Sequence, residues 1–468
     1  MKFALVSLPK NEFRYPPIGL LRIAAYVRAK MEEVEIKLID NTFEDILEEI
    51  KRFNPDIIGM TTFTSYYQDA IEFTKKIKSM SKNVKVIIGG PHITTLPDSF
   101  DKCFDAGVIG EGEETIVRIL EAIEHGRAFN KIKGVIYYKG STLVINQGKK
   151  FSANLDELHK IDYRMLNKSY FKKKFLPEIG GYGVSMGMMT SIGCPYNCRF
   201  CSIKVCWDKI RFRNLDLVTE EIKDLYYNFG VRHIDFYDDL FSVNKARLRE
   251  FRNKLKTAGL LKKLTFSCQA RTNLIDDEMC KILNSLNVKT VVFGFESGSD
   301  KILRYIKNDL SLSVETNKKA VVLCVKHGLN VFGCLMMGMP NETLEDMQKT
   351  IDFIDFARKQ GALRIWTQIL VPLPGTEMWE IAKKSGRIKD KENDWRAINI
   401  HNQENPILLE KNIPYEKFLE KYRLAKKKCR YFVYKLMLKT LVENPLTIVY
   451  LIKESTYYLK RLTNFLKQ

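Results

Sequence analysis

The stretch that decides the fold of this chain is TSIGCPYNCRFC, residues 190–201, in which three cysteines follow the spacing C-x-x-x-C-x-x-C. Thiolate is the soft ligand that iron–sulfur iron prefers, and no histidine lies within 30 residues before Cys194 or after Cys201. We therefore predict that Cys194, Cys198 and Cys201 hold a cubane iron–sulfur cluster. A cubane has four irons, so three cysteines leave one iron open for a substrate or a cofactor. The alternatives are free core thiols, or a zinc site whose fourth ligand is distant in sequence.

The cysteine triad resembles the signature of the radical S-adenosylmethionine (SAM) superfamily, in which an aromatic residue, here Phe200, precedes the last cysteine. The resemblance implies a [4Fe–4S] cluster whose open iron chelates SAM, and an electron donor such as ferredoxin or flavodoxin. It also implies that SAM is cleaved to a 5′-deoxyadenosyl radical, which abstracts hydrogen from an unactivated carbon. The cofactors carry this chemistry, whereas the protein orients them and excludes side reactions.

Around the cysteines, apolar strand-like stretches alternate with helical patterns from about residue 184 to residue 376. The expected strands are 184–192, 233–239, 264–271, 290–297, 331–340 and 365–373, and the helical patterns include 219–229, 245–258, 276–286 and 344–358. Six such units match the partial, TIM-like (β/α)6 barrel of the superfamily. The chemistry of such barrels takes place at the carboxyl ends of the strands.

The end of the fourth expected barrel strand reads GFES and resembles the superfamily's G-x-E-S element. The resemblance implies that Gly294 lets SAM approach closely, and that Glu296 and Ser297 contact its ribose hydroxyls and its ammonium group. Together with Phe200, these residues are the predicted SAM site. A buried carboxylate needs partners, which bound SAM would provide. A helix N-cap at Ser297 or Ser299 is compatible with this role.

Other polar residues near the expected strand ends allow more than one role. Asp238 and Asp239 fit a helix cap better than an acid–base dyad, and Arg271 would make a strong pair with a carboxylate. Cys206 lies five residues after the triad. A fourth protein ligand would block SAM, so we expect Cys206 to be a spare thiol.

The first 125 residues have a repeating pattern of their own. Apolar runs at 3–9, 35–40, 57–64, 84–92 and 106–113 alternate with amphipathic stretches such as 20–31, 43–53 and 66–80. This alternation predicts a doubly wound, Rossmann-like parallel sheet that binds its ligand beyond the carboxyl ends of the strands. Small, hydroxyl-bearing and glycine residues at those ends allow a nucleotide-like or tetrapyrrole ligand to approach the backbone.

The same strand ends resemble the cobalamin-binding domain found upstream of many radical SAM domains. The matching segments are PPIGL at 16–20, NPDIIG at 54–59, GGPH at 89–92 and GEGE at 110–113. The resemblance implies that the turns after the third, fourth and fifth strands hold the corrin. The predicted cobalamin-contacting residues are Thr61, Thr64, Gly89, Gly90, Gly110 and Glu111.

One departure from the cobalamin-binding pattern concerns the lower face of the corrin. The mutase-type D-x-H-x-x-G loop, whose histidine ligates cobalt from below, is absent after the first strand, where KNEF stands at 10–13. Radical SAM relatives commonly lack this loop and hold cobalamin without that ligand. His92 follows the fourth strand, and we expect it in a loop or facing the substrate. The alternative is a sheet that keeps the fold but binds nothing.

The length and composition indicate a globular protein of two or three domains, with 468 residues, 45% of them hydrophobic and 28% charged. We expect a cobalamin-binding domain at 1–130, a connector at 131–183 with a hairpin turning at 139–140, the barrel at 184–400 and a basic helical region at 401–468. The sequence has no recognisable secretory signal and no apolar stretch of about 20 residues. Its ten cysteines then indicate a reducing cytoplasm.

The net charge of +20 is concentrated in the tail, because the last 58 residues carry 14 basic and 4 acidic side chains. Helical spacing of apolar residues predicts a helix over 414–441, and a second basic, aromatic segment follows at 446–467. We interpret the tail as a helical cap on the barrel with a solvated basic face. The alternative is peripheral contact with anionic lipids, which would deliver a lipid or isoprenoid substrate. RNA binding is disfavoured, because no nucleic-acid motif is present.

Together these features predict a cobalamin-dependent radical SAM enzyme that methylates an unactivated carbon of a small or lipid-like molecule. The alternative is a radical SAM enzyme that uses no cobalamin and performs C–C coupling or cyclisation on a lipid-like substrate. A non-catalytic cobalamin or redox sensor is a third hypothesis. A methylthiotransferase is disfavoured, because its upstream domain carries three cluster cysteines and here Cys103 stands alone before Cys194.

Overall fold

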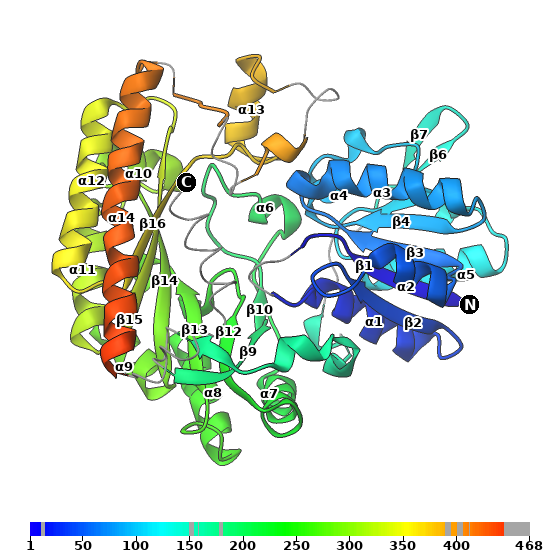
Figure 1. The fold of residues 1–468 in the computed structure, drawn as a ribbon, viewed down its shortest axis with the longest axis horizontal. Coiled ribbons are helices and arrows are strands. Elements are labelled where there is room, and N and C mark those ends of the chain that lie inside the picture. The colour runs from blue at the N-terminus through cyan, green and yellow to red at the C-terminus, as the bar shows by residue number, and fades with distance from the viewer. Residues whose placement is uncertain are drawn as a thin grey trace.

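The computed structural model describes residues 1–10, 15–148, 154–157, 159–176, 181–388, 395–399, 406–410 and 412–443. Two α/β units lie side by side, the first in blue and cyan and the second running from green to orange (Figure 1). Among the described helices, none is long and apolar enough to cross a membrane.

The first unit is the predicted doubly wound sheet. Its strands are β1 (Lys2–Ser7), β2 (Glu35–Asp40), β3 (Ile57–Thr61), β4 (Lys85–Gly89), β5 (Ala106–Val108), β6 (Val135–Lys139) and β7 (Thr142–Ile145), and its helices are α1 (Ile18–Lys30), α2 (Ile46–Phe53), α3 (Tyr67–Met80), α4 (Pro91–Thr95) and α5 (Glu113–Glu124). The strands follow the order β2-β1-β3-β4-β5-β6-β7, and β1 to β5 are parallel.

Both faces of this sheet are apolar, as a parallel sheet covered by helices requires. Alternate residues of β1 enter different cores. Phe3 and Leu5 belong to the core that includes α1 and α5, whereas Ala4 and Val6 belong to the core that includes α2 and α3. Because β1 to β5 are parallel, their carboxyl ends lie at one edge of the unit (Figure 1). The turns predicted to bind a ligand lie at this edge.

The hairpin expected in the connector is hydrogen-bonded to this sheet. β6 pairs antiparallel with β5 through Gly107 and Ile136, and β7 pairs with β6. The turn lies at Lys139–Gly140 as predicted, where Gly140 has a φ of +62°. The hairpin thus extends the first sheet past residue 130.

The second unit is the predicted partial barrel. Its strands are β8 (Lys174–Leu176), β9 (Gly181–Met188), β12 (Val231–Phe236), β13 (Thr265–Ala270), β14 (Val288–Glu296), β15 (Asn330–Met337) and β16 (Arg364–Ile369), and its helices include α7 (Leu215–Phe229), α8 (Lys245–Thr257), α9 (Asp277–Ser285), α10 (Asp300–Lys307), α11 (Val314–Lys326) and α12 (Leu344–Lys359). The order is β16-β15-β14-β13-β12-β9-β8, in which β9 to β16 form six parallel strands and β8 is an antiparallel addition that the sequence did not predict.

The tail helix α14 (Tyr415–Glu443) lies beside α12 and β16, in agreement with the predicted cap on the barrel (Figure 1). Its side chains at helical spacing, Phe418, Tyr422, Ala425 and Cys429, are all buried in the barrel core. The apolar face that a membrane-binding helix would offer is therefore covered as far as Cys429. The second tail segment predicted at 446–467 lies outside the described residues.

Candidate functional site

The three cysteines lie on a loop between two short strands, β10 (Ser191–Ile192) and β11 (Arg211–Phe212), which pair antiparallel. All three thiols are free and half-buried. Burial raises the pKa of Cys194, and it raises that of Cys201 to about 12, so these thiols are protonated until a metal displaces the proton. Among the described residues, no set of three His, Cys, Asp or Glu is close enough to hold a single ion. A cubane does not require this closeness, because each cysteine binds a different iron.

Arg271 connects the end of β13 to the cysteine loop. Its guanidinium lies 3.5 Å from the Cys198 sulfur and 3.7 Å from the centre of the Tyr196 ring. The same group donates to Asp309 at 2.8 Å, which confirms the expected pairing of Arg271 with a carboxylate. Arg271 therefore holds a positive charge beside the Cys198 sulfur.

Asp238 and Asp239 fix the strand that enters the cysteine loop, which corrects the interpretation of the pair as a helix cap. The Asp238 carboxylate accepts hydrogen bonds from the backbone N–H of Thr190 at 2.7 Å and from the hydroxyls of Thr190 and Ser191 at 2.6 and 2.5 Å. Asp239 accepts from the N–H of Gly193 at 2.8 Å. Burial raises the pKa of Asp239 to about 6. Both carboxylates therefore hold backbone next to Cys194.

Two of the four predicted SAM residues, Gly294 and Glu296, lie at the end of β14, and a third, Phe200, approaches them from the cysteine loop. Glu296 has a φ of +62°, a strained backbone conformation for a residue with a side chain. Its carboxylate turns back over Gly294, where an added Cβ would lie 2.2 Å from Glu296 Oε1. Lys307, at the end of α10, pairs with Glu296 at 2.8 Å, and its ammonium is 5.9 Å from the Phe200 ring centre. Lys307 therefore brings Glu296 and Phe200 into one group.

The fourth predicted SAM residue, Ser297, belongs to a different network. It is fully buried, its hydroxyl accepts from the Ser299 N–H at 3.1 Å, and it lies 3.3 Å from the Thr350 hydroxyl on α12. Ser299 is the N-cap residue of α10, although its side chain bonds to Asp346 instead of the helix N–H groups. Ser297 therefore belongs to the contact between α10 and α12 and is separate from the group formed by Glu296, Lys307 and Phe200.

The turns predicted to hold the corrin are joined to one another by hydrogen bonds. The Thr62 N–H donates to Gly89 O at 3.1 Å, and the Gly110 N–H donates to the Thr94 hydroxyl at 3.0 Å. Gly90 has a φ of +97°, and an added Cβ would lie 2.5 Å from Thr61 Oγ1 and 2.8 Å from the Thr62 backbone. The structure thus brings together the turns after β3, β4 and β5, and the absence of a side chain at Gly90 lets its turn pack closely on Thr61 and Thr62.

Glu111 differs from the other predicted cobalamin residues, because its carboxylate is engaged by the second unit. Arg211 of β11 binds it with two hydrogen bonds, Nη1 to Oε2 at 3.1 Å and Nη2 to Oε1 at 2.5 Å. The side chains of Arg211 and Glu111 are only 7% and 5% exposed. The ion pair therefore connects the turn after β5 to the cysteine loop.

His92 is not in a loop and does not face a substrate, which corrects the prediction. It lies in α4, fully buried, with Nδ1 3.1 Å from the hydroxyl of Thr64 and Nε2 2.9 Å from that of Ser99. Its ring packs between Tyr67 and Trp395, at centroid distances of 3.9 and 4.9 Å. Burial lowers the pKa of His92 to about 3, so the imidazole is neutral. His92 therefore packs the turn that carries Thr64.

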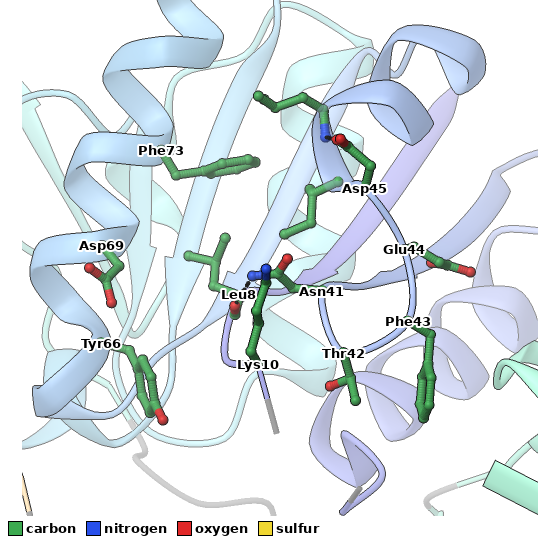
Figure 2. A pocket seen from close by; sticks show the side chains of 12 residues that line it. Leu8, Lys10, Asn41, Thr42, Phe43, Glu44, Asp45, Tyr66, Asp69 and Phe73 are labelled. Carbon is green, nitrogen blue, oxygen red and sulfur yellow. Dashed lines mark hydrogen bonds between the residues drawn. The ribbon is translucent and has the colours of Figure 1, made fainter. Parts of the chain in front are cut away.

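A cavity of about 850 Å³ opens beside these turns, at the carboxyl ends of β1 and β2 (Figure 2). Its walls come from Leu8 and Lys10 after β1, from residues 41–47 after β2, and from Tyr66, Asp69 and Phe73. Chains that leave neighbouring parallel strands toward opposite faces create such a crevice. Asn11, Glu12 and Phe13, which stand where the mutase-type loop would begin, lie outside the described residues.

Three residues in these groups were not predicted from the sequence: Lys307, Arg211 and Trp395. Each acts on a partner in another element, at separations of 11, 100 and about 300 residues respectively. Glu296 was expected to be a buried carboxylate whose partners bound SAM would provide, and in the structure its partner is Lys307. The need for a partner was the only signal that a cation lies nearby.

Comparisons with known proteins identify both units. Residues 8–120 match the B12 binding domain family, and residues 188–354 match the radical SAM superfamily. An uncharacterized methyltransferase of Pyrococcus horikoshii, PH0819, is 35% identical over 376 residues, which are 78% of this chain and 78% of the relative. Cytidylyl-2-hydroxyethylphosphonate methyltransferase of Streptomyces wedmorensis is 25% identical over 75% of this chain and 71% of its own length.

A solved structure has the same fold. The radical SAM methyltransferase TsrM of Kitasatospora setae, determined with cobalamin and a [4Fe–4S] cluster bound, superposes with a TM-score of 0.66. The match covers 82% of this chain and 75% of TsrM at 19% identity. Both cofactor-binding units thus occur in this chain in the order and arrangement of that fold. The chain therefore belongs to the cobalamin-dependent radical SAM methyltransferase family, whose cofactors are a [4Fe–4S] cluster, SAM and cobalamin.

Proposed function

We propose that this enzyme methylates an unactivated carbon of a small molecule, and that the cofactors meet between the two units. The observation that carries the proposal is the position of the cysteine loop. It joins the barrel through Asp238 and Asp239, and it contacts the first unit through the Arg211–Glu111 pair. The predicted corrin turns and the predicted cluster ligands therefore belong to one continuous structure.

The donor sets fit these cofactors. Cys194, Cys198 and Cys201 are the proposed cluster ligands, and the guanidinium of Arg271 lies 3.5 Å from the Cys198 sulfur. The turns that contain Thr61, Thr64, Gly89, Gly90 and Gly110 are proposed to hold the corrin, since glycine has no side chain to keep a large ring away from the backbone. When bound, the cluster and SAM supply the carbon radical and cobalamin supplies the methyl group.

Phe200, Gly294 and Glu296 are the proposed SAM site, and we add Lys307 to it. The buried Glu296–Lys307 pair presents one anionic and one cationic group next to each other. These charges suit the ammonium and carboxylate of an amino acid, the groups by which SAM is recognised. Gly294 is required because any side chain there would displace the Glu296 carboxylate.

The proposal is tested by loading the protein without oxygen with iron, sulfide and hydroxocobalamin and measuring both cofactors after desalting. We expect close to one cobalamin and one cluster per chain, and formation of 5′-deoxyadenosine from SAM on reduction. A Cys198→Ala variant should lose SAM cleavage but keep cobalamin. Retention of the cluster without cobalamin would instead favour the cobalamin-independent coupling reaction.

A matched glycine pair tests the corrin turns. Gly90→Ala and Gly126→Ala both place a side chain at positive φ, +97° and +62°, but only the new Cβ at residue 90 meets the backbone of a neighbouring turn. Gly90→Ala should lose bound cobalamin and keep the cluster, whereas Gly126→Ala should keep both. Equal cobalamin retention in the two variants would contradict the proposed corrin site.

A further inference from the structure

The cysteine loop is closed at its base. β10 and β11 pair through Ile192 and Arg211 where the loop begins and ends. Gly193 has a φ of +90°, and an added Cβ there would lie 2.4 Å from Lys209 O. Residues 193–210 therefore form one unit, which contains the three cysteines and the short helix α6 (Ile203–Cys206).

The two strands at this base differ in their contacts. The incoming strand is bound to the barrel, because Asp238 accepts three hydrogen bonds from Thr190 and Ser191. The outgoing strand touches the barrel where Arg247 lies 4.9 Å from the Phe212 ring centre, and it is bound to the first unit by the two hydrogen bonds from Arg211 to Glu111. Helix α6 contacts α4, the helix that follows the Gly89–Gly90 turn (Figure 1). The cysteine loop is thus fastened between the two units.

The Glu111–Arg211 pair has the properties of a positioning element. Two parallel hydrogen bonds between a guanidinium and a carboxylate fix orientation as well as distance. Both side chains are almost fully buried, so the pair is weakly screened by solvent. Glu111 lies between Gly110 and Gly112 in the turn after β5. Because these glycines have no side chains to pack, the contact of Glu111 with Arg211 holds this turn in place.

We propose that Glu111 and Arg211 form a positioning pair that sets the distance between the cluster and the corrin. The inference rests on the proposed function, since it needs both cofactors in their sites, and it replaces direct corrin binding as the role of Glu111. Reacting groups must be placed closely, and a displacement of about 1 Å can cost about 100-fold in rate. A pair that joins the corrin turn to the cluster loop fixes this placement directly.

The test uses the full chain loaded with both cofactors, and variants that remove the pair without removing volume. Glu111→Gln keeps the shape of the side chain and loses its charge, and Arg211→Lys keeps the charge and loses the two-pronged contact. Glu113→Gln is the matched control, because Glu113 forms a comparably buried pair with Arg22 at 2.8 Å inside the first unit. The readout is the distance distribution between cob(II)alamin and the reduced cluster, measured by pulsed electron paramagnetic resonance.

We expect Glu111→Gln and Arg211→Lys to bind both cofactors but to broaden and shift this distance distribution, whereas Glu113→Gln matches the wild type. An unchanged distribution in both pair variants would overturn the inference. Loss of cobalamin from Glu111→Gln, with Arg211→Lys unaffected, would also overturn it and would assign Glu111 to the corrin.

A second measurement separates this inference from the proposed function. If the wild type binds the cluster but no cobalamin, the proposed function fails. Hydrogen exchange of the cluster-loaded protein still tests the positioning pair in that case. Glu111→Gln should then speed amide exchange at β11 about tenfold or more relative to Glu113→Gln. Equal exchange in the two variants would overturn the positioning role.

Discussion

The Glu296–Lys307 pair is the residue-scale feature with the clearest energetic consequence. Both side chains are less than 10% exposed, and removing one partner from a buried pair leaves the other charge uncompensated. We expect Lys307→Met to lower the free energy of unfolding by about 3 kcal/mol and to weaken SAM binding at least about tenfold. Calorimetric titration of cluster-loaded protein with SAM measures the second effect.

A surface pair provides the control for this change. Lys349 pairs with Glu345 at 2.7 Å one turn away on α12, and both side chains are half or more exposed. Lys349→Met should change the unfolding free energy by less than about 1 kcal/mol and leave SAM affinity intact. Equal SAM affinity in Lys307→Met and the wild type would exclude Lys307 from the SAM site.

Glu342 gives the protein a pH dependence that can be assigned to one residue. Its side chain is fully buried in the turn after β15 and accepts from the Gly338 and Met339 N–H groups, and its Oε1 atom makes no hydrogen bond to any residue that the structure describes. Burial raises the pKa of Glu342 to about 8. The folded state therefore holds a proton that the unfolded state has already lost, so the stability that Glu342 contributes falls as the pH rises from about 4.5 to about 8.

We expect the difference in melting temperature between Glu342→Gln and the wild type to grow in favour of the variant over this pH range. Glutamine is a permanently neutral substitute that keeps the acceptor for the two N–H groups. Melting curves from pH 5 to pH 8.5 measure the difference. A constant difference across the range would place the pKa of Glu342 outside it.

At the scale of elements, α14 is a structural part of the barrel. Phe418 is fully buried and lies against the turn at Gly338. Phe418→Ala should lower the free energy of unfolding by about 3–5 kcal/mol, because it leaves a cavity beside β16. Lys417→Ala, at an exposed neighbouring position, should change it by less than about 0.5 kcal/mol. Denaturant unfolding of the two variants makes the comparison.

The sequence predicted the elements well for a physical reason. Parallel strands such as β3 and β4 are apolar on both faces, so they read as short continuous runs whose ends are marked by polar residues or glycine. The cysteine spacing could predict cluster ligands because it is a local pattern. The six-strand barrel, the doubly wound sheet and the tail helix were all confirmed.

What the sequence could not predict are contacts between elements that are distant along the chain. Periodicity places Glu111 at a strand end, where ligand contact is the usual expectation, but it contains no information on Arg211, which lies 100 residues later. His92 was misassigned for the same reason, since its cover, Trp395, follows the whole barrel. Partner identity depends on the packing of the two units, which no local pattern encodes.

At the scale of the whole molecule, the segment η9 (Trp395–Ala397) fastens the end of the barrel to the first unit. Trp395 packs on His92 and Tyr67, and Arg396 pairs with Asp69 and Glu72 at 2.7 Å. Trp395→Ala should weaken the coupling between the two units. Calorimetry should then show two unfolding transitions that lie further apart in temperature than those of the wild type. Arg396→Ala removes only exposed ion pairs and should have a small effect. Coincident transitions in Trp395→Ala would contradict this role.

The Trp395–His92 contact also has a consequence for synthesis on the ribosome. His92 emerges about 300 residues before the tryptophan that covers it, which corresponds to roughly 15–60 s at translation rates of about 5–20 residues per second. During this time the aromatic surface around His92 and Tyr67 has no cover from the barrel end of the chain. A chaperone or an early-bound cofactor therefore has its longest access to this surface while the rest of the chain is being synthesised.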